Sequence, residues 1–94
     1  KLLIVVYNGT GSDGFAAQAA QILQSKGYTV QETGNADSAV YTETLVIYKD
    51  TEDEAAAEAI VADLGVGRAV YASVYYNLKT DIQVVAGSDW KPVR

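Results

Sequence analysis

The hydrophobic positions of the chain follow two periods, one typical of strands and one typical of helices. Residues 2–7 form a continuous apolar run rich in β-branched residues, which predicts a strand buried on both faces. The apolar positions Phe15, Ala19, Ile22 and Leu23 then repeat at the spacing of one helix face, while glutamines fall on the opposite face. The first part of the chain is therefore expected to form a strand followed by an amphipathic helix.

The same two periods recur in the rest of the chain. A second helical stripe stops before a capping glycine and consists of Ala57, Ile60, Val61 and Leu64. Shorter runs with strand-like patterning occupy residues 28–32, 43–48, 68–72 and 81–87. The order strand, helix, strand, strand, helix, strand, strand predicts an α+β two-layer sandwich. We expect a ferredoxin-like plan, with both helices on one face of a largely antiparallel sheet.

The size and charge of the chain exclude several classes of protein. The 94 residues suffice for one domain, residues 1–94, and no apolar run approaches the roughly 20 residues that cross a bilayer. The net charge of −5 would repel a phosphate backbone, so nucleic acid is not an expected partner. The chain contains no cysteine and no histidine, which removes thiolate metal sites and the usual nucleophilic triads. We therefore expect no catalytic residues, no metal and no cofactor.

A glycine-rich segment lies between the first strand and the first helix. Gly9, Gly11 and Gly14 have the spacing of the dinucleotide-binding fingerprint. In that fold a helix carries the chain from the second strand to the third, but residues 33–42 are short and rich in small polar residues. Asp13 is expected to cap the helix and to occupy the amides that a pyrophosphate would need. The segment therefore predicts a tight turn, with nucleotide binding as the less favoured alternative.

The tight turn has a conformational consequence. We expect Gly9 or Gly11 to adopt a positive φ, a conformation that costs glycine little and other residues more. A second glycine, Gly87, is expected to lie in a looser turn and to tolerate a larger side chain better.

Acidic and aromatic residues each allow a functional and a structural interpretation. The carboxylates of residues 50–54 are expected to stabilise the start of the second helix rather than to act as a catalytic pair. Aromatic rings that could stack on sugars belong to Tyr41, Tyr71, Tyr75, Tyr76 and Trp90. Strand tyrosines more often pack against their neighbours, which is the favoured interpretation for this set.

Three segments together resemble the LytR C-terminal domain family. They are NGTGSDGFAAQAAQILQSKGYTV (residues 8–30), GNADSAVYTETLVIY (residues 34–48) and DIQVVAGSDW (residues 81–90). They keep the order and spacing of the family pattern over nearly the whole chain. The positions that match are Asn8, Gly9, Thr10, Gly11, Gly27, Gly34, Asn35, Ala36, Thr44, Val46, Tyr48, Gly87, Asp89 and Trp90.

The resemblance implies an extracytoplasmic domain of Gram-positive cell-envelope proteins, found after a LytR-CpsA-Psr catalytic domain or beside a membrane helix. That catalytic domain transfers polymers from a lipid carrier to peptidoglycan, and its arginine and aspartate machinery is missing here, where Arg68 and Arg94 are the only arginines. The chain begins at Lys1 and has no methionine, so it is expected to be a piece of a longer protein. The resemblance implies that this longer protein is anchored in the membrane. Its expected function is non-catalytic binding of wall glycan or positioning of a catalytic domain. The alternative is a protein-interaction domain or homodimer that pairs an exposed edge strand.

The predicted topology also locates a candidate binding site. A helix between the first two strands returns the chain to its starting end, so the loops that follow both strands emerge together. Hydrogen-bonding and stacking side chains in these loops belong to Asn8, Thr10, Asn35, Asp37 and Tyr41. Such a group suits a neutral polyhydroxylated ligand better than an anion. These side chains could equally satisfy their own loop backbones, and this alternative stays open.

Overall fold

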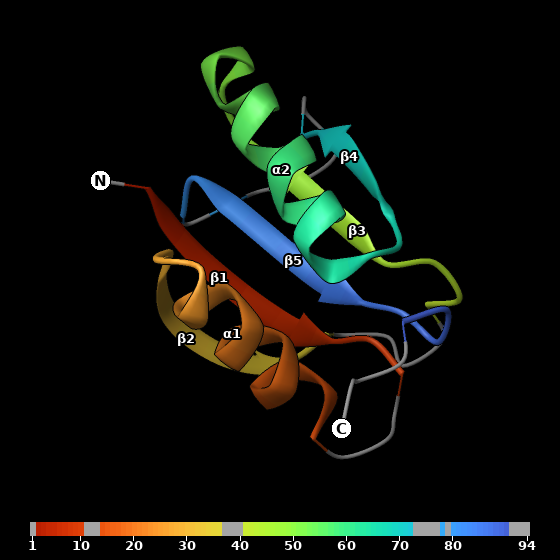
Figure 1. The fold of residues 1–94 in the computed structure, drawn as a ribbon. Coiled ribbons are helices and arrows are strands. Elements are labelled where there is room, and N and C mark those ends of the chain that lie inside the picture. The colour runs from red at the N-terminus through yellow and green to blue at the C-terminus, as the bar shows by residue number, and fades with distance from the viewer. Residues whose placement is uncertain (1, 11–13, 37–40, 73–77, 79, 91–94) are drawn as a thin grey trace.

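The described part of the chain folds into a five-stranded sheet with two helices (Figure 1). The structure, a computed structural model, describes residues 2–10, 14–36, 41–72, 78 and 80–90. In chain order the elements are β1 (Leu3–Asn8), α1 (Phe15–Ser25), β2 (Thr29–Asn35), β3 (Leu45–Tyr48), a 3-10 turn (Thr51–Asp53), α2 (Glu54–Leu64), β4 (Arg68–Tyr71) and β5 (Ile82–Ala86). The predicted α+β class is confirmed. Neither helix has the length and apolar content that a bilayer-spanning helix needs.

The pairing of the strands differs from the prediction. The strand order is β2-β1-β5-β3-β4, and only the β3–β5 pair is antiparallel, whereas β1–β2, β1–β5 and β3–β4 are parallel. The expected largely antiparallel sheet and the ferredoxin-like plan are therefore wrong. In that plan a third strand separates the two strands joined by a helix, whereas here α1 and α2 each join neighbours. Hydrophobic periodicity does not distinguish these pairings, because both bury the same faces.

Both helices cover the same face of the sheet, as the sequence predicts (Figure 1). The units β1-α1-β2 and β3-α2-β4 run in opposite directions and extend toward opposite edges, so right-handed crossovers place both helices on one side. Small residues on α1 let it approach the strands closely, and Leu23 fills the core beside them. Ile60 and Leu64 of α2 pack into the same cluster.

The opposite face of the sheet carries a second, smaller cluster. Leu45 and Ile47 of β3 and Val85 of β5 are buried there with Ala72 and Leu78. The partly buried side chains that pack against this cluster belong to Tyr7, Ala36, Tyr41 and Val70. Aromatic side chains therefore border the sheet on the side away from the helices.

The glycine-rich segment enters α1 differently from the prediction. The N-cap of α1 is Gly14, with φ +92°, rather than Asp13, which lies outside the described residues. Gly9 does not have the expected positive φ, and Gly11 also lies outside the described residues. The reason for a glycine at position 9 is close packing: a Cβ there would lie 2.7 Å from a ring carbon of Tyr41.

Candidate functional site

The candidate site lies at one end of the sheet, which we call the loop end. It consists of residues 7–10, 34–36, 41–44 and 87–90, where β1, β2 and β5 finish and β3 begins. The Gly9 amide donates to the Ala86 carbonyl at 2.9 Å, and the Tyr41 amide donates to the Gly9 carbonyl at 3.0 Å. The Ser88 amide in turn donates to the Tyr41 carbonyl at 3.0 Å. Backbone hydrogen bonds thus join segments that are far apart in the sequence.

Four of the five predicted site residues meet at this end of the sheet. Asn8 pairs with Asn35 in the register of β1 and β2, and the Ala36 amide donates to the Asn8 carbonyl at 3.0 Å. Thr10 and Tyr41 follow in the loops, whereas Asp37 lies outside the described residues. The argument from the parallel strands β1 and β2 therefore correctly predicted that the ends of these two strands lie together.

The Asn8 side chain forms hydrogen bonds within its own loop. Its side chain is buried, and its Oδ1 accepts hydrogen bonds from the Thr10 amide at 2.9 Å and from the Thr10 hydroxyl at 2.7 Å. This short-range pattern holds a turn after β1. The alternative that loop side chains satisfy their own backbone therefore applies to Asn8, while Asn35 is exposed.

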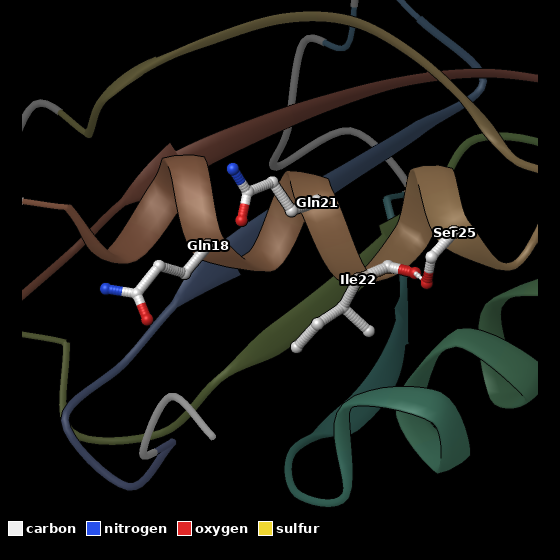
Figure 2. Close-up of a pocket in the computed structure, with 4 residues that line it drawn as sticks. All are labelled: Gln18, Gln21, Ile22 and Ser25. Atoms are coloured by element: carbon white, nitrogen blue, oxygen red, sulfur yellow. Dashed lines mark hydrogen bonds between the residues drawn. The ribbon is translucent and has the colours of Figure 1, made fainter. Parts of the chain in front are cut away.

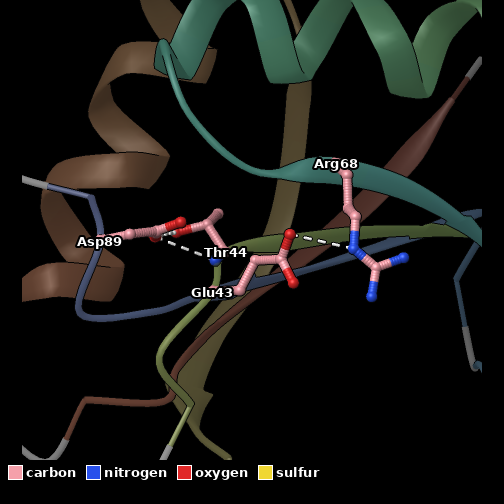
Figure 3. A network of polar contacts seen from close by, with 4 residues as sticks. All are labelled: Glu43, Thr44, Arg68 and Asp89. Carbon is pink, nitrogen blue, oxygen red and sulfur yellow. Dashed lines mark hydrogen bonds and ion pairs between the residues drawn. The ribbon is translucent and has the colours of Figure 1, made fainter.

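A polar network fastens the start of β3 to the chain after β5 (Figure 3). Thr44 is fully buried, and both its amide, at 2.9 Å, and its hydroxyl, at 2.7 Å, donate to Oδ1 of Asp89. The same hydroxyl accepts from the Gly87 amide at 3.0 Å. On the surface beside it, Arg68 Nε lies 2.9 Å from Glu43 Oε2. The network links the start of β3 to the turn after β5.

Trp90 belongs to the core and is not available to stack on a ligand. Only 2% of the residue is exposed, and its indole Nε1 donates to the Leu64 carbonyl at 3.1 Å. Its ring meets Phe15 edge to face, with centroids 5.9 Å apart. The packing interpretation therefore holds for Trp90, whereas Tyr75 and Tyr76 lie outside the described residues.

Two tyrosine rings at the loop end lie against glycines. The ring of Tyr41 lies over Gly9, and a Cβ at Gly34 would be 3.3 Å from Cε1 of Tyr7. Both tyrosines are half-buried and pack against the cluster on the face away from the helices. Sequence reasoning missed Tyr7. What marks Tyr7 is that it pairs with Gly34, and this pairing cannot be inferred without the strand register.

An open depression on α1 offers little chemistry (Figure 2). It is lined by Gln18, Gln21, Ile22 and Ser25, from successive turns of the helix. The Ser25 hydroxyl donates to the Ile22 carbonyl at 2.6 Å and is thus committed to the helix backbone. None of the described residues that line this depression is charged, and we assign it no function.

Two tyrosines at the other end of the sheet have a raised pKa. Burial raises the pKa of Tyr48, and the nearby Glu54, Glu58 and Tyr71 raise it further. Burial also raises the pKa of Tyr28, with an added contribution from Asp63. Among the described residues, no group of three His, Cys, Asp or Glu side chains is arranged to hold a metal ion.

The family comparison decides where the chain belongs. The family model described as "LytR cell envelope-related transcriptional attenuator" matches residues 1–90. The chain belongs to the LytR C-terminal domain family. The resemblance inferred from the motifs is thereby confirmed, and the motif residues Asn8, Thr44, Gly87, Asp89 and Trp90 have structural roles in this LytR C-terminal domain.

Relatives of known sequence or structure are mycobacterial where an organism is given. A "Vesiculogenesis and immune response regulator" of Mycobacterium tuberculosis is 39% identical over 61 residues, which cover 64% of this chain and 37% of that protein. The domain thus matches little more than a third of its relative's length.

Two solved structures share the fold. The solution structure of the C-terminal domain of RV0431 has a TM-score of 0.67 and 28% identity, over 93% of this chain and 72% of that one. The crystal structure of the soluble domain of a conserved hypothetical secreted protein from Mycobacterium marinum has a TM-score of 0.72 over 97% of this chain and 62% of that one. Its identity is 22%, so this likeness shows the fold alone.

Proposed function

We propose that this LytR C-terminal domain is a non-catalytic, extracytoplasmic binding module of a cell-envelope protein, and that its loop end contacts wall glycan. The envelope setting is supported by the family description. The sequence relative carries the name of a regulator rather than of an enzyme, which agrees with a binding role. The glycan ligand is argued from the site itself.

The observation that carries the proposal is that two tyrosine rings pack against glycines. Tyr41 lies over Gly9, and Tyr7 lies beside Gly34, both at the loop end and on one face of the sheet. A pyranose ring presents an apolar face of C–H groups and a rim of hydroxyls. An aromatic ring with a polar tip matches such a ligand, because the ring contacts the C–H face while hydroxyls and amides nearby bond to the rim.

The two glycines leave room for the tyrosine rings to lie flat against the backbone. A side chain at position 9 would occupy the space of the Tyr41 ring, since a Cβ there would also lie 2.9 Å from Cγ1 of Val85. The rings are therefore held by the packing of the sheet before any ligand arrives. A side chain that is already ordered loses less rotamer entropy on binding, which favours affinity.

Neighbouring polar groups suit a neutral ligand. Asn35 is exposed at the end of β2, and Thr10 is half-buried in the adjoining loop. The Asn35 amide can donate to and accept from sugar hydroxyls, and the Thr10 hydroxyl, which donates to Asn8 Oδ1, can accept from them. The net charge of −5 disfavours binding of the anionic polymers of the wall relative to its neutral disaccharide backbone.

Co-sedimentation with purified peptidoglycan sacculi tests the proposal. We expect the 94-residue chain to sediment with sacculi, and a Tyr7→Leu, Tyr41→Leu variant to bind about tenfold more weakly, as the loss of two aromatic contacts predicts. Leucine keeps apolar packing on the sheet but removes the flat ring. Tyr71→Leu is the matched control, because Tyr71 is 49% exposed on β4, at the edge of the sheet.

The outcomes separate the possibilities. If the unmodified chain does not sediment above an albumin control, glycan recognition is wrong. If Tyr71→Leu weakens binding as much as the double variant does, the glycan does not bind at the loop end. Far-ultraviolet circular dichroism of each variant excludes unfolding as the cause of a loss.

A further inference from the structure

Among the strands that the structure describes, none pairs with the outer side of the edge strand β4. It is the last strand in the sheet order, and its inner side pairs with β3. The Arg68 amide donates to the Thr44 carbonyl at 3.1 Å, and the Ala72 amide donates to the Tyr48 carbonyl at 2.9 Å. Successive residues of a strand direct their N–H and C=O groups to opposite sides. The groups of Ala69 and Tyr71 therefore point away from the sheet.

The opposite edge of the sheet is less suited to accept another strand. The register of β2 against β1 shifts between Ile4 and Val5, because Val30 and Glu32 face these residues and Gln31 is an extra residue. A bulge of this kind interrupts the regular spacing of edge groups, and an exposed charge such as Glu32 further discourages pairing. No such shift occurs in the pairing of β4.

The surroundings of β4 are aromatic and acidic. Tyr71 is 49% exposed, and its ring lies 5.7 Å from that of Tyr48. A depression between α2 and β4 is lined by Glu58, Val61, Gly67, Arg68 and Ala69. Residues 50–67 contain no lysine or arginine, and their acidic members are Asp50, Glu52, Asp53, Glu54, Glu58 and Asp63.

We propose that the outer edge of β4 binds an extended segment of a partner protein that carries basic side chains at alternate positions. The backbone of that segment would bond to the free groups of Ala69 and Tyr71. Its alternate side chains would lie on the helix side, where a lysine or arginine meets the Tyr71 ring and the carboxylates of Glu54 and Glu58. This site is separate from the loop end and does not depend on glycan binding.

The charges favour such a partner over a second copy of the chain. Pairing of β4 with β4 would bring two α2 helices together, and each carries the exposed carboxylates of Glu54 and Glu58. Like charges placed close together oppose association. Arg68 does not offset them, because it already pairs with Glu43. A basic segment meets the same surface with attraction.

Amide NMR titration of the isotope-labelled chain tests this proposal. The probe is a short acetylated and amidated peptide of alternating lysine and threonine. We expect saturable shifts of the Ala69 and Tyr71 amides and slower hydrogen exchange at both. A Glu54→Gln, Glu58→Gln variant should bind about fivefold more weakly, as two exposed ion pairs of ordinary strength predict. Glu32→Gln, on the opposite edge strand, is the matched control and should bind as the parent chain does.

Two further peptides complete the test. A peptide of alternating lysine and proline keeps the charge but loses donors for strand pairing, so equal binding by it would overturn the proposal. Equal binding by a glutamate-threonine peptide would overturn the choice of a basic partner. Shifts of the β4 amides with protein concentration alone, together with a dimer in sedimentation, would assign the edge to a second copy instead.

Discussion

Replacing Gly87 by alanine should destabilise the fold more than the same change at Gly9 or Gly27. An added Cβ would lie 2.5 Å from the carbonyl carbon of Glu43, 2.7 Å from its oxygen and 2.8 Å from the Thr44 amide nitrogen. All three atoms belong to the backbone, so no side-chain rotation relieves the contact. The chain after β5 would have to move away from the start of β3.

The size of the loss follows from what this movement breaks. Forcing an extra carbon into a packed site costs about 1–3 kcal/mol. The hydrogen bond from the Gly87 amide to the Thr44 hydroxyl would also lengthen, at a cost of about 1 kcal/mol. We therefore expect Gly87→Ala to lower the free energy of unfolding by about 3 kcal/mol. This reverses the expectation from the sequence that Gly87 lies in a looser turn than Gly9.

Two other glycines provide the comparison. Gly27 has φ +95° and no atom within 4 Å of an added Cβ, so Gly27→Ala should cost only the left-handed backbone strain, about 1 kcal/mol. Gly9→Ala should fall between the two, because the atoms it meets belong to side chains of Tyr41 and Val85. Urea unfolding followed by fluorescence of Trp90, the single tryptophan, measures all three. A loss for Gly87→Ala no greater than that for Gly27→Ala would refute the packing argument.

Three further predictions concern other parts of the chain. Asp89→Ala should lower the free energy of unfolding by about 3 kcal/mol in urea titrations, because it leaves two donors of the buried Thr44 without an acceptor. In ultraviolet titration, Tyr48 should lose its proton above the usual tyrosine pKa of about 10. Because its pKa is higher in the folded than in the unfolded chain, the protonated phenol stabilises the fold fully below pH about 10, and this stabilisation is lost as the pH rises through the folded pKa. NAD, FAD and ATP should show no saturable binding tighter than about 100 μM in calorimetry, which corresponds to roughly 5.5 kcal/mol. The reason is that β3, the strand that follows β2, runs antiparallel to β5 and hence to β1 and β2, whereas a dinucleotide-binding fold continues with a parallel strand.

The positions of the helices and strands could be predicted from the sequence because each element buries a continuous stripe. The stripe of Ala57, Ile60 and Leu64 matches the buried side of α2, and the apolar run of residues 2–7 nearly coincides with β1. The order of strands could not be predicted in this way. A buried strand has the same composition whether its neighbour is parallel or antiparallel, and the insertion of β5 between β1 and β3 leaves no local signal.

Part of the candidate site could likewise be predicted from the sequence, and part could not. The meeting of Asn8 and Asn35 was predictable, because it requires only that β1 and β2 be parallel. The bond between Thr44 and Asp89 joins residues 45 positions apart, and the placement of Tyr7 beside Gly34 depends on register. Periodicity specifies which side of an element is buried, but it does not specify which residue of another element lies opposite.

Amide NMR mapping with soluble disaccharide fragments of peptidoglycan tests the central claim most directly, because it reports the site as well as the binding. We expect saturable shifts at Gly9, Thr10, Gly34 and Asn35, the residues beside the two tyrosine rings, and little change along β4. Absence of shifts at saturating fragment concentration, or shifts confined to β4 and α2, would contradict glycan recognition at the loop end.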